Sequence, residues 1–285
     1  MTRRLGILWR GPLDSCNYGC AYCPFAKRPT RQANLDADRA ALARFVAWVA
    51  RATEWRLQLL FTPYGEALIW PWYRQALAQL SHLSHVELVA IQTNGSGPMD
   101  FLDAADRRRV ALWMSWHPSE IARAAMVAKV AALSATGTRL SLGMVAAPAR
   151  LADAEALRRE LPPTVPMWLN AEKPLPRFTP DELTRFTGID PDFALETRRQ
   201  RTRGLDCRTG DEVVSIDGDG DVRRCHFVDD VLGNLYRDDL AALLRPRACT
   251  RATCECWIGY AHLPSLSVRE RHAPDGFLAR IRRVV

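Results

Sequence analysis

The sequence of 285 residues predicts an α/β protein with a partial (β/α)6 barrel and a smaller C-terminal unit. Six short β-rich runs alternate with amphipathic helical patterns, which is typical of a parallel sheet covered by helices. The alternation stops near Lys173, in a proline-rich segment. Six βα units are fewer than the eight of a closed TIM-type barrel, so the predicted sheet is open at one side.

The barrel elements follow from the apolar pattern. The predicted strands are Arg4–Trp9, Leu57–Phe61, Val86–Thr93, Val110–Trp116, Arg139–Val145 and Val165–Asn170. Within Asp38–Ala52 the apolar residues recur at helical spacing, namely Leu42, Phe45, Val46 and Val49. A similar pattern over Ser119–Leu133 has Ser119 as its predicted N-cap and Gly137 just beyond its end.

The chain is predicted to divide into three segments. Residues 1–175 form the barrel, residues 176–204 a linker with helical character, and residues 205–285 the C-terminal unit with a β-hairpin and a helix. The hairpin is predicted from "VVSIDGDGDV", in which Val213, Val214 and Ile216 form one strand and Val222 begins the next. The intervening Asp-Gly-Asp-Gly is a turn signal.

Composition narrows the class of protein. The net charge is +7 and the pI about 9.2, but the arginines are scattered in small groups without interleaved aromatic residues, which disfavours nucleic acid as a partner. No apolar run approaches the ~20 residues that span a bilayer. The N-terminal segment lacks a signal-peptide pattern. We therefore expect a cytoplasmic protein with no membrane partner.

The eight cysteines form two groups, at 16, 20 and 23 and at 207, 225, 249, 254 and 256. Clustered cysteines in the cytoplasm indicate metal or redox chemistry, and the long separation predicts two sites. The first group can wrap a zinc ion with a distant fourth ligand, or an iron–sulfur centre. Three thiolates on a 4Fe–4S cluster would leave one iron open for a substrate.

The stretch "CNYGCAYCP" resembles the CxxxCxxC motif of the radical S-adenosylmethionine (radical SAM) superfamily, including Tyr22 before the last cysteine. The resemblance implies that a 4Fe–4S cluster on Cys16, Cys20 and Cys23 binds SAM through its open iron. "TPYGEAL" resembles the family's GGEP motif, with Glu66 on the SAM amino group, although Tyr64 and Ala67 depart from it. By the same resemblance the further SAM contacts are Asn94 in "TNG", Ser115 in strand four, and Met144 against the adenine.

The second group resembles the twitch domain, a SPASM-like module that carries an auxiliary 4Fe–4S cluster in radical SAM enzymes. Such a domain needs four cysteines, and five are present. The ligands suggested by this resemblance are Cys207, Cys225, Cys254 and Cys256, with Cys249 as a free catalytic thiol. An exchange of Cys249 with Cys254 or Cys256 remains open, because spacing does not decide it.

The whole layout most resembles radical SAM aminoglycoside epimerases, which convert neomycin C to neomycin B. The resemblance implies an aminoglycoside-like substrate, an external electron donor such as flavodoxin or ferredoxin, and return of a hydrogen atom by Cys249. Candidate acids for the cationic substrate are Glu172, Asp14, Asp229 and Glu255. The alternatives are a diol dehydrogenase, a peptide-modifying radical SAM enzyme, and a non-catalytic iron–sulfur or zinc protein that binds nucleic acid.

Overall fold

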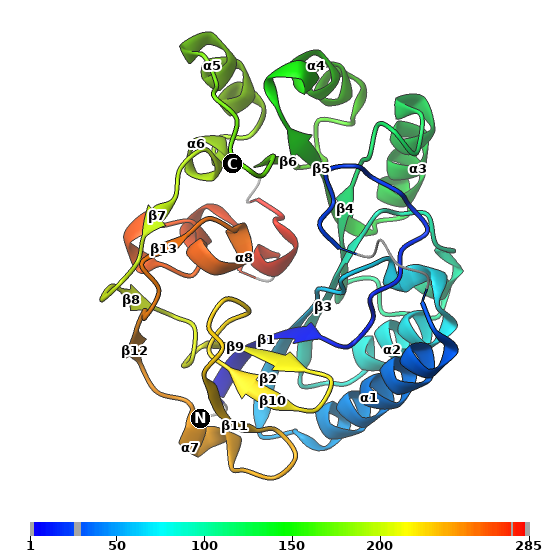
Figure 1. The fold of residues 1–285 in the computed structure, drawn as a ribbon. Helices are drawn as coiled ribbons and strands as arrows, with labels where there is room; N and C mark the ends of the chain where they lie inside the picture. Colours follow the sequence, from blue (N-terminus) through cyan, green and yellow to red (C-terminus); the bar gives the residue numbers. More distant parts are fainter. Residues whose placement is uncertain (1–2, 26–29, 275, 283–285) are drawn as a thin grey trace.

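Six parallel strands form the centre of the computed structural model, which describes residues 3–25, 30–274 and 276–282 (Figure 1). They lie side by side in chain order: β1 (Arg3–Arg10), β2 (Trp55–Phe61), β3 (Val86–Thr93), β4 (Val110–Ser115), β5 (Arg139–Ala146) and β6 (Met167–Ala171). Strands buried on both faces are continuous apolar runs, which is why the sequence marks them. The curved sheet is a partial barrel, and its predicted strands are confirmed.

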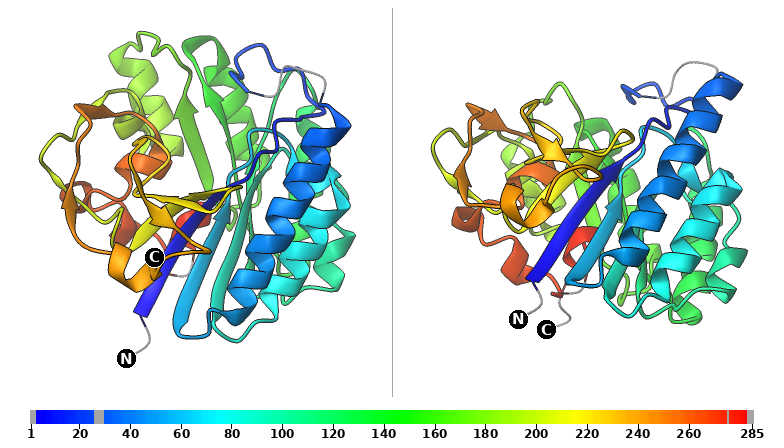
Figure 2. Two further views of the ribbon diagram at one scale, coloured as in Figure 1. Left: turned by 60° about the horizontal axis from the view of Figure 1, so that its bottom comes forward. Right: turned by 90° about the horizontal axis from the view of Figure 1, so that it is seen from below.

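The helices that follow the barrel strands pack on the outer face of the sheet (Figure 2). They are α1 (Gln32–Arg51), α2 (Pro71–Ser81), α3 (Arg123–Ala135) and α4 (Leu151–Glu160). Helix α3 begins four residues after Ser119, the predicted N-cap, and Ala122 is the N-cap instead. The Ser119 hydroxyl donates to Glu120 Oε1 at 3.2 Å. Gly137 ends this segment as predicted, with a φ of 76° that suits glycine.

The predicted hairpin is present and extends the barrel sheet. Strand β9 (Val213–Asp217) pairs in parallel with β1, and β10 (Asp221–Arg223) and β11 (Val231–Asn234) follow antiparallel, giving nine strands in one sheet. The connection from the barrel contains α5 (Pro180–Ile189) and α6 (Phe193–Glu196). The remaining elements include α7 (Leu240–Leu243), α8 (Trp257–Tyr260) and two small ladders, β7 (Gln200–Arg201) with β13 (Thr253–Cys254) and β8 (Asp206–Cys207) with β12 (Arg247–Ala248).

The C-terminal segment fills the concave face of the barrel. Helix α8 and residues 277–279 pack against inward-facing side chains of the strands and form a second hydrophobic core there. Arg280, only 2% exposed, lies among the rings of Trp113, Trp168 and Trp257, at 5.8, 5.0 and 4.9 Å from their centroids. Its charge is balanced by Asp190, at 3.3 Å.

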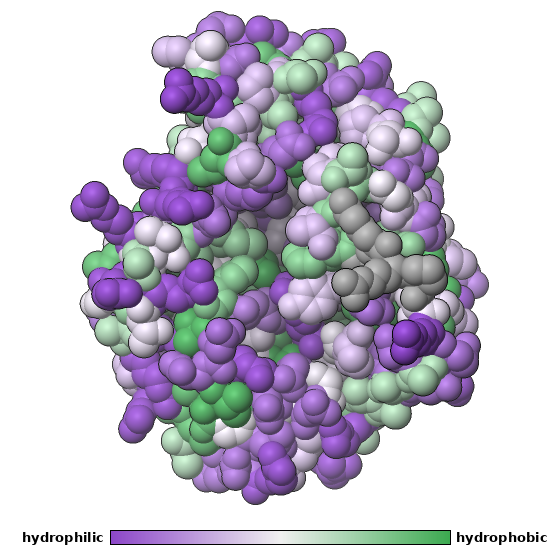
Figure 3. Space-filling model, in the orientation of Figure 1, coloured by the Kyte–Doolittle hydropathy of each residue, from purple (hydrophilic) through white to green (hydrophobic). Residues whose placement is uncertain are grey.

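The face that carries the carboxyl ends of the strands is hollowed near its centre (Figure 3). This hollow lies between the barrel and the C-terminal segments in the orientation of Figure 1. Among the described residues, no helix combines the length and apolar character needed to cross a membrane.

Phe277→Ala is expected to lower the free energy of unfolding by about 3–5 kcal/mol, because it removes a ring from a packed core. Phe277 is 3% exposed and its ring centroid lies 5.2 Å from that of Trp257. Urea unfolding of identically prepared proteins measures the effect. Leu205→Ala, at a side chain 42% exposed, is the control and should change stability by less than ~1 kcal/mol. Equal effects of the two variants would contradict the packing role of Phe277.

Candidate functional site

The three N-terminal cysteines lie in the loop that follows β1. Cys16, Cys20 and Cys23 line one cavity of about 700 Å³ at the carboxyl ends of the barrel strands. The loop is attached to the segment after β2, because the carbonyl oxygen of Ser15 accepts the Glu66 N–H at 2.9 Å. Gly65 allows this approach, since a Cβ there would lie 1.7 Å from the Ser15 carbonyl oxygen.

Glu66 is buried in the wall of the same cavity and joins two strand ends. Its Oε1 accepts hydrogen bonds from Leu68 N–H (2.9 Å) and Thr93 Oγ1 (2.8 Å), and its Oε2 accepts from Asn94 N–H (2.6 Å). Burial raises the pKa of Glu66, while these hydrogen bonds lower it. Asn94 in turn donates to Asn17 Oδ1 in the cysteine loop at 3.2 Å. Glu66 and Asn94, both expected as SAM contacts, thus lie together in the wall of this cavity.

His117, two residues after Ser115, is a site residue that sequence reasoning missed. Both residues line the first cavity. His117 Nδ1 lies 2.7 Å from the Tyr22 hydroxyl and 3.3 Å from Cys20 Sγ. Burial lowers the pKa of His117 to about 4, so the ring is neutral at pH 7. Its place directly after strand four was the available signal, since residues there reach the carboxyl end of the sheet.

Arg10 was also missed, and it lies at the end of β1 in the wall of the first cavity. Its guanidinium carbon is 4.5 Å from the centroid of the Tyr64 ring, and its Nε donates to the Thr62 carbonyl oxygen at 3.0 Å. The departure of Tyr64 from the GGEP pattern therefore has a local consequence, because the ring supports this arginine.

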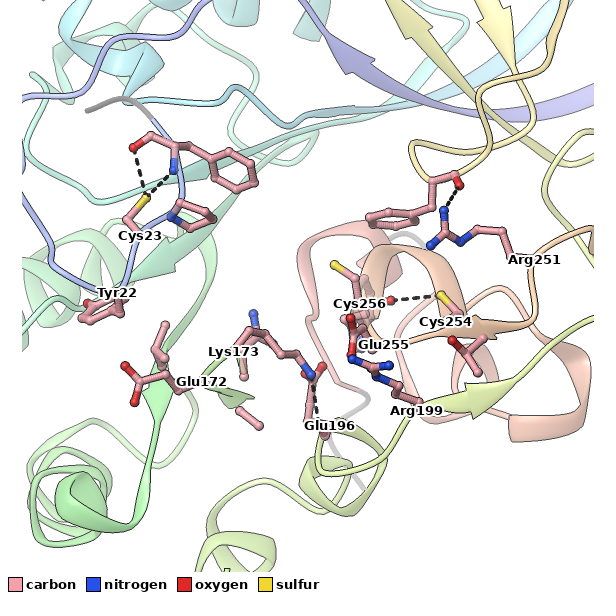
Figure 4. A pocket seen from close by; sticks show the side chains of 18 of the residues that line it. Tyr22, Cys23, Glu172, Lys173, Glu196, Arg199, Arg251, Cys254, Glu255 and Cys256 are labelled. Carbon is pink, nitrogen blue, oxygen red and sulfur yellow. Dashed lines mark hydrogen bonds and ion pairs between the residues drawn. The ribbon is translucent and has the colours of Figure 1, made fainter. Parts of the chain in front are cut away.

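A second cavity of about 750 Å³ adjoins the first, and the two share Cys23, Phe25 and His117 as lining residues. Figure 4 shows Tyr22 and Cys23 on one side of this cavity and Cys254, Glu255 and Cys256 on the other. Glu172, Lys173 and Glu196 lie between them. The second cavity therefore combines aromatic, acidic, basic and thiol side chains around one space, the basic ones being Lys173, Arg199 and Arg251.

The predicted substrate acids separate into two pairs. Glu172 and Glu255 line the second cavity, where they form ion pairs with Arg150 (3.4 Å) and Arg199 (3.0 Å). Asp14 and Asp229 are not among the described residues that line either large cavity. Asp14 is half-buried in the loop after β1 and Asp229 is exposed after β10, so both expectations are corrected.

Glu196 is the buried acid of the second cavity, and sequence reasoning missed it because it falls in the connecting segment, outside any motif. It is 2% exposed, and its Oε1 accepts the Tyr260 hydroxyl at 2.5 Å. Burial raises the pKa of Glu196, and the nearby Arg280 guanidinium lowers it. A carboxylate in this position is held by the C-terminal segment and faces the cavity.

Met144 lies elsewhere than expected. It is fully buried in the core between the sheet and the helices, whereas its neighbour Val145 lines the second cavity. Successive side chains of a strand point to opposite faces, so one residue decides the difference. This placement corrects the expectation that Met144 packs against the adenine.

The C-terminal cysteines lie near one another, and three of them, Cys207, Cys254 and Cys256, pack against the second hydrophobic core on the concave face of the sheet. Four of them, at 207, 225, 249 and 254, line a third, smaller cavity, and Cys256 lines the second. Within the part of the chain that the structure describes, no three His, Cys, Asp or Glu side chains converge as ligands of a single ion. An iron–sulfur cluster instead binds each thiolate to a different iron, so thiols spread around one cavity suit it better than they suit zinc.

No family model matches the sequence, and no curated protein matches it. Among solved structures, a histidine-tagged form of anSMEcpe with bound AdoMet is similar, at 15% identity and a TM-score of 0.52 over 84% of this chain and 82% of that one. Native anSMEcpe with bound AdoMet and the Cp18Cys peptide is similar at 14% identity and a TM-score of 0.51, over 84% of this chain and 81% of that one.

SuiB of Streptococcus suis bound to S-adenosylmethionine is similar at 11% identity and a TM-score of 0.51, with 85% of this chain matching 63% of that one. These neighbours are radical SAM enzymes with partial TIM barrels. At such identities the likeness shows that the chain shares their fold.

Gly65→Ala is expected to destabilise the protein by about 1–3 kcal/mol, because the added methyl group must push the cysteine loop away from the segment after β2. The matched control is Gly188→Ala in α5, where a Cβ meets nothing within 4 Å. That variant should be neutral or slightly stabilising, since alanine favours a helix. Thermal unfolding compares them, and a Gly65→Ala protein as stable as the control would contradict the close contact.

Proposed function

We propose that the protein is a radical SAM enzyme that epimerises one carbon centre of an aminoglycoside-type amino sugar. The observation that carries the proposal is the pair of adjoining cavities with Cys23, Phe25 and His117 in their common wall. The three-cysteine loop and Glu66 face the first cavity, while acids and a thiol face the second. A reactive group made in one cavity can therefore act on a molecule held in the other.

In the first cavity, Cys16, Cys20 and Cys23 would hold a 4Fe–4S cluster, and Glu66, Asn94 and Ser115 would contact SAM. Tyr22 would support this region through its hydrogen bond with His117. When bound, the cluster and SAM supply a 5′-deoxyadenosyl radical that abstracts a hydrogen atom from the substrate. The chain orients the substrate and excludes water.

In the second cavity, three carboxylates suit the ammonium groups of an amino sugar, namely Glu172, Glu196 and Glu255. Aromatic rings in the same wall, Tyr22 and Phe227, offer apolar faces to a sugar ring. The same wall also carries Lys173, Arg199 and Arg251, so an ammonium group of the substrate would replace existing partners of these carboxylates. A small-molecule substrate fits a cavity of about 750 Å³, within the usual range for such ligands.

Inversion of the carbon requires a hydrogen atom from the face opposite to the abstraction. A cysteine thiol of the C-terminal unit, residues 205–285, would donate its hydrogen atom to the substrate carbon radical, so that its S–H bond breaks as the new C–H bond forms. The resulting thiyl radical regains the thiol by taking up one electron and one proton. The electron would come from an external donor such as flavodoxin or ferredoxin, by way of a twitch-type auxiliary 4Fe–4S cluster in this unit.

The anaerobically reconstituted enzyme, incubated with SAM, a reductant and neomycin C in deuterated water, should form 5′-deoxyadenosine and an epimer that carries one deuterium. The thiol exchanges its hydrogen with solvent, which is the source of that deuterium. Mass spectrometry and chromatography against the authentic epimer measure both products. A product two mass units lighter would be a ketone and would establish a diol dehydrogenase in place of the epimerase.

Glu66→Gln is expected to weaken SAM binding by about tenfold or more. Both carboxylate oxygens of Glu66 accept hydrogen bonds from backbone N–H groups or a hydroxyl, and the NH2 group of glutamine would point its own hydrogens at one of these donors. Equilibrium dialysis of the cluster-loaded protein with SAM measures the affinity. Asp229→Asn is the control, since this residue is exposed and lines neither large cavity. Unchanged SAM affinity in Glu66→Gln would contradict the role given to Glu66.

A further inference from the structure

The five C-terminal cysteines differ in the cavities that they line: Cys254 lines both the second and the third, and Cys256 is the one that does not line the third. Cys207, Cys225, Cys249 and Cys254 all line the third cavity, together with Thr202, Thr209 and Tyr260. Cys256 lines the second cavity instead, beside Glu196 and Glu255. We propose that the first four cysteines hold the auxiliary iron–sulfur cluster and that Cys256 is the free thiol that returns the hydrogen atom. This inference rests on the proposed function.

Backbone pairing brings the segments of Cys207 and Cys249 together at the third cavity. The ladder of β8 with β12 pairs Cys207 with Arg247, two residues before Cys249. Two further hydrogen bonds hold Cys249 in place, from its own N–H to the Leu205 carbonyl oxygen (2.9 Å) and from the Gly204 N–H to the Cys249 carbonyl oxygen (2.8 Å). Cys249 is therefore fixed in the cavity wall by main-chain contacts on both sides.

Arg224 ties Cys225 to that same strand. Its guanidinium is buried and donates to the carbonyl oxygens of Arg247, at 2.9 Å, and Ala248. The Arg224 Nε also lies 3.4 Å from Thr209 Oγ1, which contacts Cys207 Sγ at 3.1 Å. Three of the four thiol-bearing segments are thus connected around one arginine.

Cys254 completes the set through the second ladder and a glycine. Strand β13 pairs Cys254 with Gln200 of β7. The thiol lies over Gly259 of α8, where a Cβ would come within 2.5 Å of Cys254 Sγ and 3.1 Å of the Phe227 ring. The missing side chain at Gly259 therefore gives the Cys254 sulfur its position. Four thiols at one cavity match the number that one 4Fe–4S cluster takes.

Cys256 stands apart because it is the N-cap of α8. Its carbonyl oxygen accepts the N–H groups of Gly259 (2.9 Å) and Tyr260 (3.0 Å), which fixes the residue at the start of the helix. Its side chain lies on the second cavity with Glu196 nearby (Figure 4). A thiol there meets the substrate rather than the cluster.

Glu196 marks this part of the cavity as a place where a ligand binds. The Tyr260 hydroxyl and Arg280 both approach its Oε1, at 2.5 and 4.0 Å. The Lys173 ammonium is also close, 3.4 Å from the Glu196 carbonyl oxygen, and the carboxylate faces the second cavity. A buried carboxylate that faces a cavity needs donors on both oxygens, and a substrate ammonium or hydroxyl group supplies one. That donor would place the reacting sugar next to Cys256.

The assignment exchanges Cys249 and Cys256 relative to the expectation from the sequence. In the reaction, the Cys256 S–H bond breaks and the substrate C–H bond forms, which leaves a thiyl radical on Cys256. One electron from the external donor, through the adjacent cluster, and one proton from solvent restore the thiol. Cys254 lines both cavities, so the cluster would lie directly behind the thiol that it reduces.

Replacing Cys256 and Cys249 separately in the reconstituted holoenzyme tests which of the two is the free thiol. Cys256→Ala should keep the ~8 irons of two clusters and the cleavage of SAM, yet form no deuterated epimer. Cys249→Ala should lose ~4 irons and the auxiliary signal in electron paramagnetic resonance. Loss of ~4 irons from Cys256→Ala, with none from Cys249→Ala, would overturn the assignment.

Alkylation of the unmodified holoenzyme gives a second readout that needs neither variant. Because burial raises the pKa of the Cys256 thiol to about 11, the reaction is run at alkaline pH, where iodoacetamide should label Cys256 while the cluster protects Cys249 and Cys254. Tryptic cleavage after Arg247 and Arg251 places Cys249 in peptide 248–251 and the other two in peptide 252–269, where fragmentation separates them. Label on Cys249 with Cys256 protected would refute the proposal. If the holoenzyme cleaves no SAM but labels as expected, the proposed function fails and the ligand assignment stands.

Discussion

The buried carboxylate of Glu66 is the interaction on which the arrangement of the site depends. A carboxylate without water needs donors on its oxygens, and here they come from Leu68, Thr93 and Asn94. These contacts join the segment after β2 to the end of β3. The same segment holds the cysteine loop through Ser15. One acid thus fixes three consecutive parts of the cavity wall relative to one another.

The C-terminal part of the chain completes the barrel from inside. Six parallel strands leave a concave apolar face that a closed barrel would fill with its own side chains. Here Trp257 and Phe277 fill it, and the buried charge of Arg280 is stabilised by the Trp257 ring and by an ion pair with Asp190. The same segment supplies Cys256 and Trp257 to the second cavity. Packing of the core and formation of the cavity therefore depend on one another.

The sequence predicted the barrel well because buried parallel strands and amphipathic helices leave strong periodic patterns. It predicted less of the site, because a pattern does not show which way a side chain points. Side chains of a strand point alternately to its two faces, and Val145 rather than Met144 points to the cavity. Glu196 also lines the cavity, but it belongs to the connecting segment, where no sequence motif marks it. Asp14 and Asp229 were plausible acids only because their surroundings in space were unknown. Spacing likewise left the roles of the late cysteines open.

The position of Cys254 in the walls of both the second and the third cavity has an electrical consequence. A redox group bound to the four thiols would adjoin the larger cavity at Cys254, which lines both cavities. Electrons could then pass between them through covalent and packed atoms, without a solvent gap in which oxygen intercepts them. The fold would in this way provide a path for electron transfer through protein atoms that ends at the bound substrate.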